Sequence, residues 1–66
     1  MISDRIKELR KDKSISQKTL GQKIGVSQKA IDYWERGVNE PKASYIIALA
    51  DYFGVSADYL LGIKEE

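Results

Sequence analysis

The sequence predicts an all-α fold: one domain, residues 1–66, made of five short helices. Three observations predict it. Apolar residues recur at spacings of three and four, serine precedes several of these apolar runs, and glycine follows most of them. No stretch alternates between apolar and polar residues for the length of a β-strand. A chain of 66 residues is also too short for a second hydrophobic core.

The first two helices are predicted from their serine caps and their apolar positions. Ser3 is expected to cap a helix that ends around Asp12 or Lys13. The apolar side of this first helix is formed by Ile2, Ile6 and Leu9. Ser16 is expected to cap a second helix, which Gly25 ends because glycine readily adopts the left-handed conformation. The buried residues of this helix lie one turn apart, at Leu20 and Ile24.

A third helix is predicted to begin only two residues after the second one ends. Gly25 permits the backbone to reverse, Val26 fills the space between the helices, and Ser27 caps a helix that runs to about Arg36. Two short helices joined by such a tight turn form a helix-turn-helix, here over residues 17–36.

The remaining chain predicts a loop and two further helices. Residues 38–41 read as a loop, and residues 43–53 as a helix. The buried side of that helix comprises Ile46, Leu49, Ala50 and Phe53. Ser56 is expected to cap a short fifth helix that Gly62 closes. This helix carries Leu60 and Leu61.

Composition argues against an enzyme. The chain has no cysteine and no histidine, so the commonest nucleophile, general base and transition-metal ligands are missing. We therefore expect no catalytic residue, no metal site and no cofactor, and no small-molecule ligand is evident. No apolar run approaches the roughly 18 to 20 residues of a membrane span, and charged residues follow Met1 closely. These features predict a cytoplasmic protein without a membrane partner.

Charge is divided unevenly along the chain. Residues 1–36 hold nine basic and five acidic residues, a net charge of +4, whereas residues 37–66 hold two basic and five acidic residues, a net charge of −3. One interpretation is an ordinary solvated surface. The other is a polarised molecule whose basic half meets an anion such as nucleic acid.

The segment SQKTLGQKIGVSQKAIDYWERG resembles the helix-turn-helix of the Cro and lambda-repressor-like (Xre-type) transcriptional regulators. The resemblance extends over nearly the whole chain, through IKELRKDKSIS, WERGVNEPK and LADYFGVSADYLLG. It implies that the second helix of the motif enters the DNA major groove and that dimers bind palindromic operators. Two positions depart from the family. Gly21 stands where alanine is usual, which costs the helix about 1 kcal/mol, and Lys42 stands where a serine cap is common.

The third helix has an outward polar face that suits the major groove. Gln28 and Asp32 lie one turn apart, as do Lys29 and Tyr33, while Ala30, Ile31 and Trp34 turn inward. A glutamine can pair with adenine, a lysine can donate to guanine, and an aspartate can accept from cytosine or repel phosphate. Tyrosine can contact a thymine methyl group or a phosphate. The predicted base-reading residues are therefore Ser27, Gln28, Lys29, Asp32 and Tyr33.

The resemblance also implies contacts that position the domain on the DNA backbone. The expected phosphate-binding residues are Gln17, Lys18, Gly37, Asn39 and Lys42. Lys18 and Lys29 could equally be free surface lysines. Glu35 needs a partner beside DNA, and the family pattern pairs it with Arg10 in a structural ion pair. Trp34 is expected in the core.

The C-terminal helix is the expected dimer contact. The family's dimers often meet in this region, here at Ala57, Asp58 and Tyr59. Tyr52 and Tyr59 are either half-buried core residues or part of an association surface.

The resulting hypothesis is a sequence-specific regulator of double-stranded DNA that binds an inverted-repeat operator as a homodimer. It would be a small repressor of phage, plasmid or mobile-element type. A bacterium or a phage would encode it, and it would associate with the nucleoid. Two alternatives stay open. One is an antitoxin or controller protein that represses its own operon, and the other is a protein-interaction module with weak DNA binding.

Overall fold

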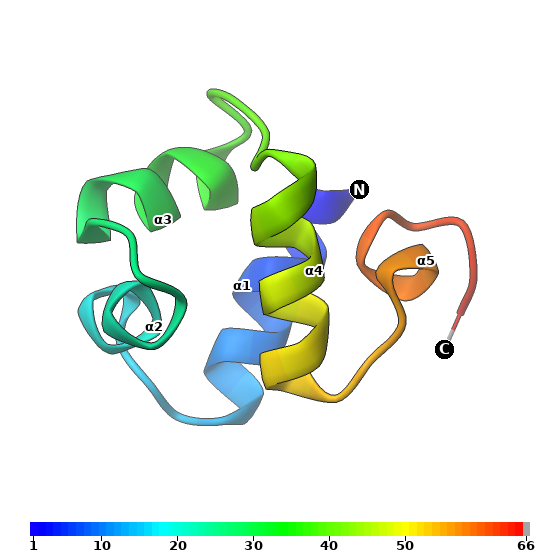
Figure 1. Ribbon diagram of the computed structural model, residues 1–66, viewed down its shortest axis with the longest axis horizontal. Coiled ribbons are helices and arrows are strands. Elements are labelled where there is room, and N and C mark those ends of the chain that lie inside the picture. Colours follow the sequence, from blue (N-terminus) through cyan, green and yellow to red (C-terminus); the bar gives the residue numbers. More distant parts are fainter. Residues whose placement is uncertain (66) are drawn as a thin grey trace.

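The computed structural model describes residues 1–65, and within them the chain forms five α-helices and no β-strand. The helices are α1 (Ile2–Asp12), α2 (Gln17–Ile24), α3 (Gln28–Arg36), α4 (Ala43–Phe53) and α5 (Ala57–Leu60). Figure 1 shows α1 and α4 in the middle of the molecule, with α2 and α3 on one side and α5 on the other. The predicted all-α fold is confirmed. Over residues 1–65, every helix is too short or too polar to cross a membrane.

Three helices begin at the serine caps that the sequence predicts. In each, the serine Oγ accepts a hydrogen bond from the amide three residues later, at 3.0 to 3.1 Å. These pairs are Ser16 with Thr19, Ser27 with Ala30, and Ser56 with Tyr59. Gly25 ends α2 with φ +88°, and Gly37 ends α3 with φ +73°. Both conformations are costly for residues that have a Cβ. The turn between α2 and α3 is thus determined locally.

Two helix boundaries differ from the predictions. Ser3 caps nothing, because α1 begins at Ile2 with Met1 as its N-cap residue. Ile2 is only 6% exposed, so packing of this side chain in the core extends the first turn of the helix toward the N-terminus. At the other end, α5 stops at Leu60, and Leu61 lies outside it and is 41% exposed.

Each helix contributes one fully buried aliphatic side chain to the centre of the core. These residues are Ile6, Leu20, Ile31, Leu49 and Leu60. Trp34 packs beside them, 6% exposed, with its ring centroid 5.6 Å from that of Tyr45. Ile31 and Trp34 therefore anchor α3 from its inner side, and its outer side takes no part in the core.

Gly21 lies where α2 packs directly on the turn that precedes α3. A Cβ at this position would lie 2.7 Å from the carbonyl oxygen of Val26, too close for an unmoved backbone. The amide of Val26 in turn donates to the carbonyl of Gly21 at 2.9 Å. The glycine that weakens the isolated helix thus permits a close backbone contact in the folded domain.

Candidate nucleic-acid interface

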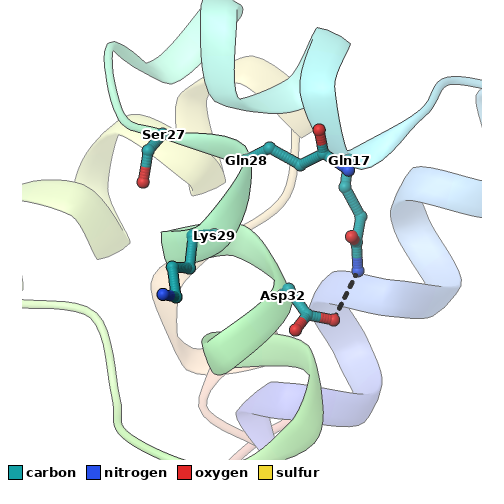
Figure 2. Close-up of a pocket in the computed structure, with 5 residues that line it drawn as sticks. All are labelled: Gln17, Ser27, Gln28, Lys29 and Asp32. Carbon is teal, nitrogen blue, oxygen red and sulfur yellow. Dashed lines mark hydrogen bonds between the residues drawn. The ribbon is translucent and has the colours of Figure 1, made fainter.

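An open hollow of about 500 Å³ lies between the start of α2 and the outer face of α3. It is lined by Gln17, Ser27, Gln28, Lys29 and Asp32 (Figure 2). Each of these residues was predicted from the sequence to contact DNA. Figure 2 shows that the Gln28 side chain extends from α3 toward Gln17 on α2. The tight turn therefore brings residues from both helices of the motif to one surface.

The outer face of α3 combines polar, aromatic and basic side chains. Gln28 and Lys29 are exposed in its first turn, and Tyr33 is partly exposed one turn later. Two cations approach the ring of Tyr33: Lys29 Nζ at 5.7 Å and Arg36 Cζ at 5.4 Å from the centroid. Such cation–π contacts restrain long side chains without neutralising them. The face thus presents positive charge beside a flat aromatic ring.

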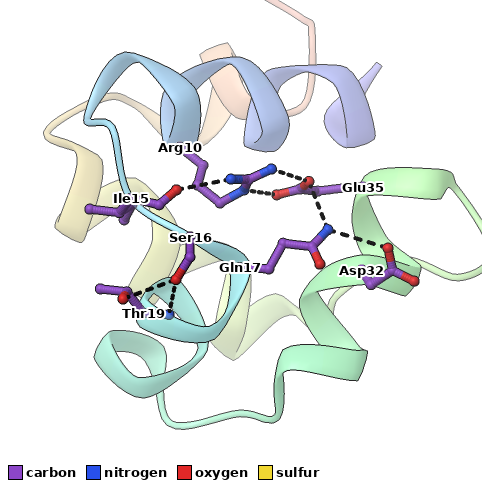
Figure 3. Close-up of polar contacts among 7 residues, drawn as sticks. All are labelled: Arg10, Ile15, Ser16, Gln17, Thr19, Asp32 and Glu35. Carbon is purple, nitrogen blue, oxygen red and sulfur yellow. Dashed lines mark hydrogen bonds and ion pairs between the residues drawn. The ribbon is translucent and has the colours of Figure 1, made fainter.

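Behind this face, Arg10 and Glu35 form the ion pair expected from the sequence (Figure 3). Arg10 Nε donates to Glu35 Oε2 at 2.6 Å, and Arg10 Nη2 donates to Glu35 Oε1 at 2.9 Å. The side chain of Glu35 is 2% exposed and that of Arg10 is 12% exposed. The hydrogen bond from Arg10 to Glu35 raises the pKa of Arg10. Arg10 Nη1 also donates to the carbonyl of Ile15 at 2.9 Å, so one guanidinium joins α1, the loop before α2, and α3.

Gln17 connects the ion pair to the outer face. Its Nε2 donates to Glu35 Oε1 at 3.2 Å and to Asp32 Oδ1 at 3.3 Å (Figure 3). The other oxygen of Asp32 accepts from Arg36 Nε at 2.9 Å. The hydrogen bond from Gln17, and to a smaller extent that from Arg36, lowers the pKa of Asp32, because both bonds stabilise its charged form.

Gln17 and Asp32 were each predicted to contact DNA, but the sequence did not predict their contact with each other. Their contact depends on the angle between α2 and α3, which no sequence pattern specifies. Arg36 was not among the predicted site residues, although its spacing of four residues from Asp32 predicts an ion pair on one helix face.

The other predicted phosphate-binding residues are all exposed: Lys18, Gly37, Asn39 and Lys42. The Gly37 amide donates to the carbonyl of Trp34 at 3.2 Å, at the end of α3. Its expected contact with a phosphate stays a prediction. The side chains of Asn39 and Lys42 lie in the segment that joins α3 to α4.

The predicted dimer residues, Ala57, Asp58 and Tyr59, lie on α5 and are partly buried. Arg5 lies 4.1 Å from the ring centroid of Tyr59, and Arg5 Nη1 donates to the Tyr59 carbonyl at 3.2 Å. Asp58 lies 3.7 Å from Lys64 Nζ, which offsets its charge. Near this helix, Leu61 and Ile63 expose apolar side chains.

Tyr52, the other tyrosine considered for association, is also half-buried. It packs edge-on against Phe53, with ring centroids 5.2 Å apart. Lys13 Nζ lies 5.3 Å from the Tyr52 centroid. Tyr52 therefore covers the junction of α1 and α4 in this chain.

Five helices with a tight turn between the second and third, and an outward polar face on the third, define a helix-turn-helix domain. The chain belongs to the helix-turn-helix family, whose profile matches residues 6–60. It is 41% identical over 61 residues to Repressor protein C2 of Salmonella phage P22, covering 92% of this chain and 28% of that protein. It is 34% identical over 61 residues to the uncharacterized HTH-type transcriptional regulator YqaE of Bacillus subtilis, covering 92% of this chain and 53% of that protein. The chain thus spans about a quarter to a half of these two relatives.

Solved structures show the same relationship. The P22 c2 repressor in complex with a synthetic operator superposes with a TM-score of 0.91 at 39% identity, over 97% of both chains. The N-terminal DNA-binding domain of SinR from Bacillus subtilis superposes with a TM-score of 0.87 at 33% identity, over 100% of this chain and 97% of that one. The expected relationship to the lambda-repressor-like regulators is confirmed, and this chain is a repressor-like helix-turn-helix domain.

Proposed function

We propose that this domain binds double-stranded DNA sequence-specifically and represses transcription by occupying an inverted-repeat operator as a homodimer. The hollow between α2 and α3 carries the proposal, because its polar lining is exposed or partly exposed and the buried Ile31 and Trp34 anchor α3 behind it. The likeness to a repressor that was crystallised on its operator supports the same assignment. Blocking polymerase at a promoter requires no catalytic chemistry.

Base reading is assigned to the exposed first turn of α3. Gln28 can donate to and accept from adenine N7 and N6, and Lys29 can donate to guanine O6 and N7. Ser27 can donate its hydroxyl hydrogen while its oxygen keeps the amide of Ala30. Tyr33, one turn later, is placed for a thymine methyl group or the sugar-phosphate edge. Each good pair is worth about 1 to 3 kcal/mol of discrimination.

Positioning on the backbone is assigned to basic and amide side chains around this face. Lys18 on α2 and Asn39 and Lys42 after α3 are exposed on the elements that flank the hollow. The net charge of +4 in residues 1–36 supplies the long-range attraction. Gln17 contributes a phosphate contact when its Nε2 turns away from the carboxylates, since both present bonds are long.

Dimerisation is assigned to α5, through Ala57, Asp58 and Tyr59. One recognition helix with about three base contacts cannot distinguish its site from the ~10⁶ or more competing sites of a genome. Figure 1 places α5 on the opposite side of the molecule from α2 and α3, along a longest dimension of 27 Å. Reading two half-sites of an inverted repeat requires a twofold axis near α5 that sets the two α3 helices about 34 Å apart, one turn of DNA.

The salt dependence of binding tests this function. We expect the logarithm of the affinity for a duplex to fall by roughly 0.9 per phosphate contact against the logarithm of salt, with about three to five contacts per domain. Lys18→Ala should reduce the slope by about 0.9. Lys11→Ala is the control, since it removes the same charge from an exposed residue of α1 that is assigned no phosphate contact. A wild-type domain whose binding is absent or insensitive to salt would contradict the function.

A further inference from the structure

Asp32 is the one acid on the outer face of α3 in the described chain, and both of its oxygens already have donors. Gln17 Nε2 donates to Oδ1 at 3.3 Å and Arg36 Nε donates to Oδ2 at 2.9 Å. An acid on a surface that faces DNA repels phosphate, so its presence on this surface needs an explanation. These two donors indicate that explanation, because both are groups that would themselves bind phosphate.

The carboxamide of Gln17 has no hydrogen left for DNA in this arrangement. A glutamine NH₂ group has two hydrogens, and the carboxylates of Asp32 and Glu35 take one each. Glu35 is buried behind the face and also holds Arg10, so its bond belongs to the scaffold. The bond to Asp32 is the one that holds the second hydrogen away from the solvent side.

Arg36 is restrained in a similar way. Its Nε is bound to Asp32 while its guanidinium lies 5.4 Å from the Tyr33 centroid. α3 contains two basic residues, Lys29 and Arg36, and Asp32 cancels the charge of the second. The free domain therefore presents less positive charge and one donor fewer than its outer face contains.

We propose that Asp32 is a specificity-determining residue that lowers affinity for non-cognate DNA by holding Gln17 and Arg36 and by its own charge. This inference rests on the proposed function. Non-specific binding comes almost wholly from phosphate contacts, so engaging the second hydrogen of Gln17 and offsetting the charge of Arg36 weakens it most. At a cognate site, the exocyclic amino group of cytosine or adenine satisfies the remaining lone pairs of Asp32. Guanine O6 and N7 and thymine O4 are acceptors, and Asp32 rejects them.

The test compares Asp32→Ala with Asp51→Ala, which removes an exposed acid from α4 and gives the same change in net charge. Affinity for a random duplex is measured by fluorescence anisotropy over a range of salt concentrations. We expect Asp32→Ala to bind random DNA about three- to eightfold more tightly near 0.1 M salt, with a salt slope steeper by up to about 0.9. The gain should shrink in the double variant Asp32→Ala/Arg36→Gln. Selection from a random-sequence library should return a motif with one position relaxed.

The outcomes separate this inference from the proposed function. If the wild type binds DNA with a steep salt slope but Asp32→Ala gains no more than Asp51→Ala, the role of Asp32 is wrong and the function stands. If Asp32→Ala gains equally with and without Arg36, simple repulsion explains the effect and the restraint of Arg36 is refuted. If the wild type shows no salt-dependent binding, the proposed function fails and this inference fails with it.

Discussion

Replacing Arg10 with methionine should destabilise the domain more than any surface substitution. The change keeps the apolar stem and removes three hydrogen bonds, two to Glu35 and one to the carbonyl of Ile15. Glu35 would keep a single side-chain donor, Gln17 at 3.2 Å, while 98% of its own side chain stays buried. A buried carboxylate with one weak donor is poorly solvated, so the folded state loses stability.

The size of the loss follows from burial. Breaking one partner of a buried ion pair costs about 3 to 5 kcal/mol. Domains gain roughly 0.05 to 0.15 kcal/mol of stability per residue, which gives this chain about 3 to 10 kcal/mol in total. Arg10→Met alone is therefore expected to remove between a third and all of the stability. The double variant Arg10→Met/Glu35→Leu leaves no stranded charge and should lose much less.

Urea unfolding followed by circular dichroism measures both losses. The single variants and the double variant together form a double-mutant cycle, and we expect a coupling energy of about 2 kcal/mol or more. Lys11→Met is the control, because Lys11 neighbours Arg10 on α1 but is exposed. Additive losses, or a loss from Arg10→Met no larger than from Lys11→Met, would refute the reasoning.

Three further predictions concern binding. Gln28→Ala should lose about 1 to 3 kcal/mol of binding free energy on a selected operator and little on a random duplex, as measured by anisotropy. Equal losses on both duplexes would show that Gln28 does not read bases. Tyr59→Asp should lower the affinity for the operator and the cooperativity of binding. The thermal melt of the domain should stay unchanged, since the new acid faces Arg5. Tight binding of one copy to a half-site would refute the dimer. Binding should be flat from about pH 5.5 to 8, because the chain has no histidine and the pKa of Asp32 is lowered. A lowered pKa keeps Asp32 charged until the pH falls below its ordinary range, so a titration in the neutral range would contradict this assignment.

The helices could be predicted because their ends are encoded locally. Ser27 and Gly25 act on backbone groups within a few residues, and such signals are visible in a sequence. Ser3 failed as a cap because the position of Ile2 is decided by the core, and burial overrides a local capping preference.

The residues that line the hollow between α2 and α3 could be named from the sequence, but the hydrogen bonds among them could not. The exposure of Gln28 and Lys29 follows from the helical period, and the structure places both on the outer face. The bond between Gln17 and Asp32 spans 15 positions and depends on how two helices cross. Arg36 could have been found from its spacing to Asp32, whereas the engagement of Gln17 could not.

The backbone contact at Gly21 fixes the position of α3 without using any residue of its outer face. Main-chain atoms of α2 and the turn meet there, and Ile31 and Trp34 hold the inner side of α3. The outward residues Gln28 and Lys29 take no part in that packing. Under the proposed function, substitutions at these two positions should change operator preference and leave the packing of α3 intact, which makes the domain a starting point for engineered regulators.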